Sequence, residues 1–252
     1  MTGRSQAQII EWFHLAFLQV LRARLDPARY VLKGGANLRY FFDSHRYSED
    51  IDLDVAGVEP WALTDKVDDV LASKPLALIL RSGGLGVATE EISKPKQTDT
   101  TRRWKVPIVA RDHRELVRTK IEFSNRNGEQ RYELEAVPDR VVKPYGLRAP
   151  SVQHYTAQPA AEQKVGALAG RNETQARDVF DLDLLMRTMD PDIAAIDSTT
   201  RENAADRALA LPFAAFDDQV LPFLDPDVAE LYDEDAWIQM QVLVAGRLQE
   251  DQ

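Results

Sequence analysis

The spacing of apolar residues predicts a first part of the chain in which helices and strands alternate. Residues 5–25 place apolar side chains every three or four positions, which is the period of an amphipathic helix. A short apolar run at 30–32 is typical of a buried strand. The pattern predicts helices at 5–25, 36–42 and 61–72 and strands at 30–32 and 47–55.

Further along the chain the pattern first favours strands and then favours helices. Apolar runs at 76–80 and 85–90 flank Gly83-Gly84, which predicts a hairpin. Strands are predicted at 104–110, 117–125 and 132–135, with a turn at Asn127-Gly128, and helices at 160–169 and 174–189, with two or three more after them. The sequence therefore predicts an α/β domain over residues 1–150 and a helical domain over residues 151–252.

Composition and charge narrow the class of protein. The 252 residues include no cysteine, which excludes disulfides and thiolate metal sites. No stretch approaches the roughly 20 apolar residues of a membrane span, and residues 1–13 lack the pattern of a signal peptide. We expect a cytoplasmic protein without a membrane partner.

The net charge of −10 is spread unevenly. Residues 187–252 hold 15 acidic and four basic side chains, whereas residues 96–120 hold three acidic and eight basic ones. In the basic segment Trp104 stands between Arg103 and Lys105, so the segment is a candidate to contact an RNA backbone and stack a base. The alternative is that both segments are solvated surface.

The sequence Ser-Glu-Asp-Ile-Asp-Leu-Asp at 48–54 is the main chemical signal. Side chains alternate along a strand, so Asp50 and Asp52 share one face, while Ile51 and Leu53 point into the core. Two carboxylates so placed are typical ligands of Mg²⁺ in phosphoryl or nucleotidyl transfer. Glu122, between apolar residues of a later predicted strand, is the candidate third metal ligand. The alternatives are surface or capping acids and a half-solvated strand.

A Gly-Gly turn lies between the first predicted strand and the helix that follows it. The backbone N–H groups of Gly34 and Gly35, together with the start of that helix, can hold a phosphate. Lys33 and Arg39 add positive charge nearby. A plain tight turn is the alternative interpretation, and it weakens once Asp50 and Asp52 follow.

These motifs resemble the nucleotidyltransferase superfamily that includes DNA polymerase beta, and more closely the AbiEii/AbiGii toxin family with its MenT toxins. The stretches at 30–40 (YVLKGGANLRY) and 47–54 (YSEDIDLD) resemble the family's first two motifs, and those at 161–171 (AEQKVGALAGR) and 177–185 (RDVFDLDLL) resemble its third and fourth. The resemblance implies an α+β fold, with a mixed sheet of the polymerase-beta type flanked by helices and a helical C-terminal half.

The resemblance also implies roles for individual residues. Asp50 and Asp52 would hold Mg²⁺, and the surroundings of the triphosphate would include Gly34, Gly35, Arg39 and Ser48. Lys164 matches the motif lysine that would contact the nucleotide, and one of Asp178 and Asp181 matches a catalytic acid. The residues leave alternatives open: Lys164 as a solvated helix cation, and the two aspartates as members of a salt bridge between helices.

The function implied by the resemblance is that of a Mg²⁺-dependent nucleotidyltransferase toxin of a toxin–antitoxin or phage-defence system. Such a toxin would transfer nucleotides from an NTP to the 3′ end of tRNA and so block translation, and it would have a cognate antitoxin as partner. Two alternatives are open: a nucleotidyltransferase that modifies a protein or a small molecule, and a module that binds NTP without catalysis.

Overall fold

The computed structural model describes residues 3–125 and 131–250. Its chain divides into two compact units. Unit 1 comprises Met1–Phe41 and Tyr47–His154, and unit 2 comprises Phe42–Arg46 and Tyr155–Gln252. The short segment 42–46 thus belongs to unit 2, although unit 1 contains the residues on either side of it. The turn predicted at Asn127-Gly128 lies outside the described residues.

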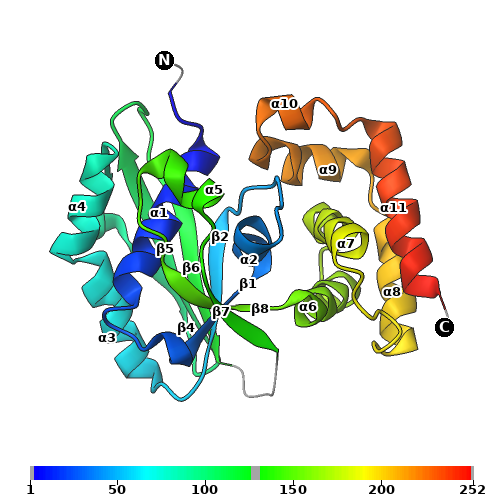
Figure 1. Cartoon of the computed structure of the whole chain (residues 1–252), viewed down its shortest axis with the longest axis horizontal. Coiled ribbons are helices and arrows are strands. Elements are labelled where there is room, and N and C mark those ends of the chain that lie inside the picture. The colour runs from blue at the N-terminus through cyan, green and yellow to red at the C-terminus, as the bar shows by residue number, and fades with distance from the viewer. Residues whose placement is uncertain (1–2, 126–130, 251–252) are drawn as a thin grey trace. The chain divides into compact units, whose positions relative to one another are not determined.

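Unit 1 is a mixed β-sheet with helices (Figure 1). Its strands run in the order β3-β5-β6-β2-β1-β8-β7, and β4 pairs with β5. β2 is antiparallel to β1 and parallel to β6. The helices are α1 (Gln6–Leu21), α2 (Gly34–Phe41), α3 (Pro60–Leu71), α4 (Lys74–Ser82) and α5 (Asp139–Val142), and the strands are β1 (Tyr30–Lys33), β2 (Asp50–Val55), β3 (Leu85–Val87), β4 (Ser93–Gln97), β5 (Thr101–Ala110), β6 (Val117–Asn125), β7 (Tyr132–Ala136) and β8 (Ser151–Tyr155).

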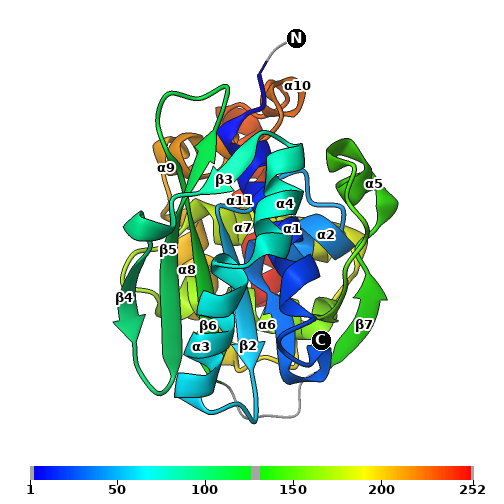
Figure 2. The same ribbon diagram turned by 90° about the vertical axis from the view of Figure 1, so that its left-hand side faces the viewer.

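One face of the sheet carries the core of unit 1. α1, α3 and α4 lie over this face (Figure 2). α1 begins at a capping box in which Ser5 and Gln8 satisfy each other's backbone N–H groups, and most of its side chains are buried. The alternate residues of β2, β5 and β6 that face these helices are buried and apolar: Ile51, Leu53, Trp104, Val106, Ile121 and Phe123. The opposite face, which we call the charged face, carries the intervening polar residues.

The hairpin predicted around Gly83-Gly84 is wrong, because residues 74–82 form α4. Ser73 caps this helix by accepting a hydrogen bond from the N–H of Leu76, and a proline stands in its first turn. Leu76 and Leu80, one turn apart, are buried against the core. A five-residue apolar run has no clear period, so the capping serine was the more informative signal. Gly84 has a φ of +74°, and β3 begins directly after it.

Two strands of the sheet were missed. β4 is polar and mostly exposed, so it offers no apolar alternation to detect. β8 occupies 151–155, where the sequence predicted the start of the helical part. Its alternate residues Val152 and His154 are buried, and β8 pairs in parallel with β1. The predicted fold class, a mixed sheet flanked by helices and followed by helices, is confirmed.

Unit 2 is helical. Phe216 stacks on Trp237 with ring centroids 4.8 Å apart, and both side chains are fully buried. Within the described residues, no helix is both long and apolar enough to cross a membrane. The helices of unit 2 are α6 (Ala157–Gly170), α7 (Ala176–Thr188), α8 (Ser198–Leu209), α9 (Phe213–Gln219), α10 (Pro226–Ala229) and α11 (Glu234–Gln249).

Candidate active site

The strand register places charged residues in rows across the charged face of unit 1. Lys33 of β1 is opposite Asp52 of β2, Asp52 is opposite Glu122 of β6, and Glu122 is opposite Arg103 of β5. Lys96 of β4 continues this row, since it pairs with Arg103. Register partners project from the same face of a sheet. The predicted ligands Asp52 and Glu122 are therefore cross-strand neighbours, although 70 positions separate them in the sequence.

A second row contains the other predicted metal ligand. Asp50 is opposite Lys120 of β6, which is opposite Lys105 of β5. The Lys120 ammonium lies 2.6 Å from a carboxylate oxygen of Asp50. Together the two rows put acidic residues on β2 and basic residues on β4, β5 and β6, with Glu122 as the one acid among the latter.

Cations of unit 1 neutralise most of the carboxylates of the charged face. The Lys33 ammonium lies 2.5 Å from Asp54, and Arg103 lies 2.5 Å from Glu122. Lys33, which was predicted to bind nucleotide, therefore has a carboxylate partner on β2. Asp54 is buried, in contrast to its partly exposed neighbours Asp50 and Asp52.

Asp52 is the exception. Among the described residues, no hydrogen bond or ion pair of its carboxylate is found. Burial, together with the charges of Asp50 and Glu122, raises the pKa of Asp52, although Lys33 and Lys120 oppose the shift. A carboxylate held beside two others, without a counter-charge of its own, is what a cation site requires.

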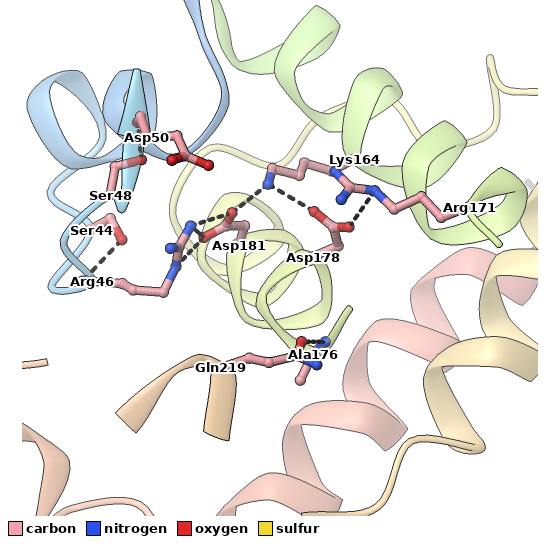
Figure 3. A network of polar contacts seen from close by, with 10 residues as sticks. All are labelled: Ser44, Arg46, Ser48, Asp50, Lys164, Arg171, Ala176, Asp178, Asp181 and Gln219. Carbon is pink, nitrogen blue, oxygen red and sulfur yellow. Dashed lines mark hydrogen bonds and ion pairs between the residues drawn. The ribbon is translucent and has the colours of Figure 1, made fainter. Parts of the chain in front are cut away.

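The glycine turn predicted to hold phosphate lies against this carboxylate. Gly34, the first residue of α2, has a φ of +68°, which favours glycine. A Cβ atom on Gly34 would lie 3.0 Å from an Asp52 carboxylate oxygen. Gly35 follows in the first turn of α2, where backbone N–H groups have no partners within the helix. The Ser48 hydroxyl donates a hydrogen bond of 2.7 Å to the backbone carbonyl of Asp50 and so fixes the start of β2 (Figure 3).

Arg39 has structural partners within unit 1. Its Nε donates a 2.8 Å hydrogen bond to Glu11, and its guanidinium lies over the ring of Tyr47, 4.0 Å from the centroid. Glu11 is buried and also accepts a 2.6 Å hydrogen bond from the Tyr145 hydroxyl. The prediction that Arg39 lies around the triphosphate stays a prediction, and these contacts tie its side chain to α1.

The oxygens of Asp50, Asp52 and Glu122 do not form a tight ligand cluster. In the described part of the chain, the group whose ligand atoms all lie within 4.8 Å of one another is Glu133, Glu135 and His154. Its two glutamates are exposed on β7, and exposed acids often gather without a metal. The better fit to a cation remains Asp52, because its charge is uncompensated.

Unit 2 contains a second set of predicted site residues, and it is buried. The Lys164 ammonium of α6 lies 2.9 Å from Asp178 and 2.5 Å from Asp181, both on α7 (Figure 3). Both aspartates are fully buried, and Lys164 is 8% exposed. The interpretation of Lys164 as a solvated helix cation is therefore wrong, and the two aspartates do form salt bridges between helices. Arg171 adds a contact of 3.3 Å to Asp178.

Sequence reasoning missed Arg46, which completes this cluster. Its guanidinium is buried and donates three hydrogen bonds of 2.9–3.2 Å to Asp181 (Figure 3). Burial alone would raise the pKa of Asp181, but Arg46 and Lys164 outweigh it and lower the pKa. The two partners are 135 positions apart, so no local spacing indicates the pair. Arg46 stands one residue before the motif-like stretch at 47–54, and nothing in its local pattern marks it.

The predicted base-stacking role of Trp104 is wrong. Trp104 is fully buried on the apolar face of the sheet, and its indole N–H donates a 2.9 Å hydrogen bond to Asp68. Alternation along β5 explains the error, because Arg103 and Lys105 point to the charged face and the tryptophan between them must point away. Arg103 and Lys105 themselves lie on the charged face.

A mixed sheet with alternating carboxylates on β2, paired with the strand that ends at a Gly-Gly turn, is typical of the class of nucleotidyltransferases. The family model described as "Nucleotidyl transferase AbiEii toxin, Type IV TA system" matches residues 16–242. Since this match spans most of the chain, the protein belongs to the AbiEii family, the nucleotidyltransferase toxins of type IV toxin–antitoxin systems. Membership implies an NTP as substrate and an antitoxin as partner.

Solved structures agree with this fold. The structure of JHP933 from Helicobacter pylori has a TM-score of 0.61 at 19% identity and covers 98% of this chain and 94% of its own. A candidate nucleotidyltransferase from H. pylori has a TM-score of 0.62, also at 19% identity, and covers 98% of this chain and 96% of its own. At this identity both likenesses concern the fold. No curated protein matches the sequence.

Proposed function

We propose that the protein uses Mg²⁺ to transfer a nucleotide from an NTP to the 3′ end of tRNA, and that this modification is how it acts as a toxin. The observation that carries the proposal is the state of Asp52. Its carboxylate is held between Asp50 and Glu122 with a raised pKa and, among described residues, without an ion pair. Such a group favours a bound cation as its missing counter-charge.

Asp50, Asp52 and Glu122 would hold the metal. Bound there, Mg²⁺ would stabilise negative charge that develops on the transferred phosphate. Gly34 leaves room beside Asp52, and the first N–H groups of α2 can donate to a phosphate oxygen. Lys120, now paired with Asp50, is placed to donate to a phosphate of the acceptor strand once that carboxylate binds a cation.

The reaction itself is a displacement at phosphorus. The 3′ hydroxyl oxygen of the acceptor bonds to the α-phosphorus, the bond to the β-phosphate oxygen breaks, and pyrophosphate leaves. The hydroxyl proton passes to a carboxylate of the charged face, which acts as general base. Positioning and electrostatic stabilisation are the main contributions that a protein makes to this chemistry.

Lys164 is proposed to serve the same reaction, as its motif predicts. Within unit 2 its ammonium is held by Asp178 and Asp181. Asp181 is engaged by two cations and has a lowered pKa, so it is a weak base and is suited to hold Lys164 in place. Asp178 is contacted by Lys164 and, at 3.3 Å, by the more exposed Arg171. Because these contacts are weaker than the three hydrogen bonds from Arg46 to Asp181, Asp178 is the better candidate for the catalytic acid of the motif.

The test is nucleotide transfer in vitro. Purified protein, MgCl₂ and each of the four α-labelled NTPs are incubated with total tRNA and, separately, with a cell extract. We expect label in tRNA that Asp52→Asn abolishes and that Asp65→Asn, a control at an exposed position of α3, leaves unchanged. Label in the protein or small-molecule fraction instead of tRNA would show that the acceptor is a protein or a small molecule and not tRNA. Binding of NTP without any transfer would identify a non-catalytic module.

A further inference from the structure

We propose that the basic residues of β4, β5 and β6 on the charged face bind the phosphate backbone of the acceptor RNA. We call them the basic columns: Lys96, Arg103, Lys105, Arg118 and Lys120. This inference rests on the proposed function, because it assigns the place where the acceptor of that reaction binds. It does not involve Trp104, whose burial excludes stacking on a base.

The pairing of like charges is the first argument. Lys105 lies directly opposite Lys120, and Lys96 lies directly opposite Arg103. Like charges at directly opposed positions of a sheet destabilise it. Lys120 and Arg103 each have a carboxylate partner. Within the described part of the chain, Lys96 and Lys105 have neither an ion pair nor a hydrogen bond of their side chains. A bound polyanion would offset both repulsions.

The extent of the basic columns favours a nucleic acid over a single triphosphate. Neighbouring strands lie about 4.8 Å apart, so the columns extend about 10 Å from β4 to β6. Arg118 pairs with Pro107, four residues along β5 from Arg103, which corresponds to about 13 Å along the strand. An area of this size presents cations to several phosphates of a backbone, whereas the triphosphate is assigned to the turn at Gly34.

A pocket joins the basic columns to Asp50, the first residue of β2. It has a volume of about 160 Å³, and Asp50, Lys105, Arg118 and Lys120 contribute to its lining. Glu49, Val106 and Thr119 complete the lining. A backbone held by the lysines and the arginine therefore ends beside Asp50, one of the proposed metal ligands. This is where the terminal hydroxyl of an acceptor strand is required.

The test is RNA binding without catalysis. The double variant Lys96→Gln/Lys105→Gln removes the two cations that lack carboxylate partners, so the ion pairs of the sheet stay intact. Binding of fluorescein-labelled tRNA is followed by anisotropy over a series of KCl concentrations, without NTP. We expect the affinity of the double variant to fall at least about tenfold at low salt, and its slope of log affinity against log salt to decrease by about 1.4–1.8, for two lost phosphate contacts.

A matched control separates local contacts from net charge. Lys74→Gln/Lys143→Gln removes the same charge from exposed positions on α4 and on the turn after α5, where Lys143 has a solvent-exposed ion pair with Asp139, and it should bind tRNA like the wild type. The assignment of the basic columns would be overturned if both double variants lost affinity equally. It would also be overturned if neither variant lost affinity.

A second measurement distinguishes this inference from the proposed function. NTP binding, measured as a thermal shift with MgCl₂, should be unchanged in Lys96→Gln/Lys105→Gln, and its loss would assign the columns to the nucleotide instead. If the wild type labels tRNA while the double variant binds it normally, the inference fails and the proposed function stands. If the wild type labels protein and does not bind tRNA, both fail.

Discussion

The charged face of unit 1 and the interior of unit 2 both contain carboxylates that are removed from water. They differ in whether cations of the protein neutralise those carboxylates. In unit 2, Asp178 and Asp181 are surrounded by Arg46, Lys164 and Arg171. In unit 1, Asp52 lies among other acids. Consequently the pKa of Asp181 is lowered and that of Asp52 is raised, although burial disfavours the charge of both.

The difference separates Asp181, a carboxylate that helps to hold the protein together, from Asp52, a carboxylate kept for a ligand. A buried carboxylate with its cations in place contributes to a unique packing, and removal of one partner leaves an uncompensated charge. A carboxylate that lacks a cation destabilises the free protein, and binding of a cation offsets this destabilisation. The comparison therefore predicts that variants in the two clusters will differ in the sign of their effect on stability.

The largest effect is expected from Arg46→Met. This substitution leaves Asp181 with Lys164 alone in a fully buried position, so the free energy of unfolding should fall by about 3–5 kcal/mol. Urea unfolding measures it. Arg187→Gln, which removes an exposed arginine paired with Asp183 on α7, should cost less than about 1 kcal/mol.

The double variant Arg46→Met/Asp181→Leu tests the cause. If the uncompensated charge is responsible, the double variant should be more stable than Arg46→Met alone, because apolar replacement of a whole buried pair is often neutral. A double variant that is less stable than Arg46→Met would mean that Asp181 contributes packing that does not depend on its charge.

Asp52→Asn, in contrast to Arg46→Met, should lower activity without lowering stability. Nucleotide transfer should fall on the order of 10³-fold, which corresponds to about 4 kcal/mol of transition-state stabilisation. The free energy of unfolding should stay equal or rise, because the amide removes the repulsion that raises the pKa of Asp52. Asp54→Asn is the comparison, since Asp54 is paired with Lys33 and its amide variant should be less stable. A destabilised Asp52→Asn would contradict the distinction between the two clusters.

The sequence predicted the charged face better than the interior of unit 2. Alternation along 50–55 correctly separated Asp52 from its core-facing neighbours, because one residue of displacement moves a side chain to the other face. The same rule, applied to 103–105, would have shown that Trp104 is buried. The pair of Asp52 with Glu122 could be guessed only from residue type, since the strand register is set by the whole sheet.

The partners of Asp181 could not be predicted from the sequence. Helical spacing offers Arg177, four residues before Asp181, whereas the observed partners Arg46 and Lys164 come from segment 42–46 and α6. β8 was missed for a related reason. It is a five-residue strand between a proline and a helix, and only its pairing with β1 identifies it.

A buried group with no charged partner should make stability depend on pH. His14, on α1, is fully buried, and burial lowers its pKa to about 3. The Thr119 hydroxyl donates to the Glu49 carbonyl, so it accepts from the His14 Nε2–H at 2.7 Å, and the ring is neutral. The unfolded chain takes up a proton below about pH 6.5 and the folded chain does not, so stability falls as pH falls.

We expect the contribution of His14 to decrease by about 2 kcal/mol between pH 8 and pH 5. Urea unfolding of the wild type and of His14→Gln at each pH isolates it, because the other histidines cancel in the difference. A difference between the two proteins that stays constant over this range would mean that His14 titrates normally, and that burial alone does not hold a group of unit 1 neutral.

The smallest effect concerns the turn next to Asp52. Gly34→Ala places a Cβ in a left-handed backbone conformation and 3.0 Å from the Asp52 carboxylate, so it should cost about 1–2 kcal/mol of stability. Gly166→Ala is the control, because a Cβ on that glycine of α6 meets nothing within 4 Å and alanine favours the helix, so stability should rise by about 0.5–1 kcal/mol. If the room beside Asp52 serves a phosphate, Gly34→Ala should also raise the KM for NTP. If Gly34→Ala is destabilised but keeps the wild-type KM for NTP, Gly34 serves only the turn, and the carboxylates bind the nucleotide without it.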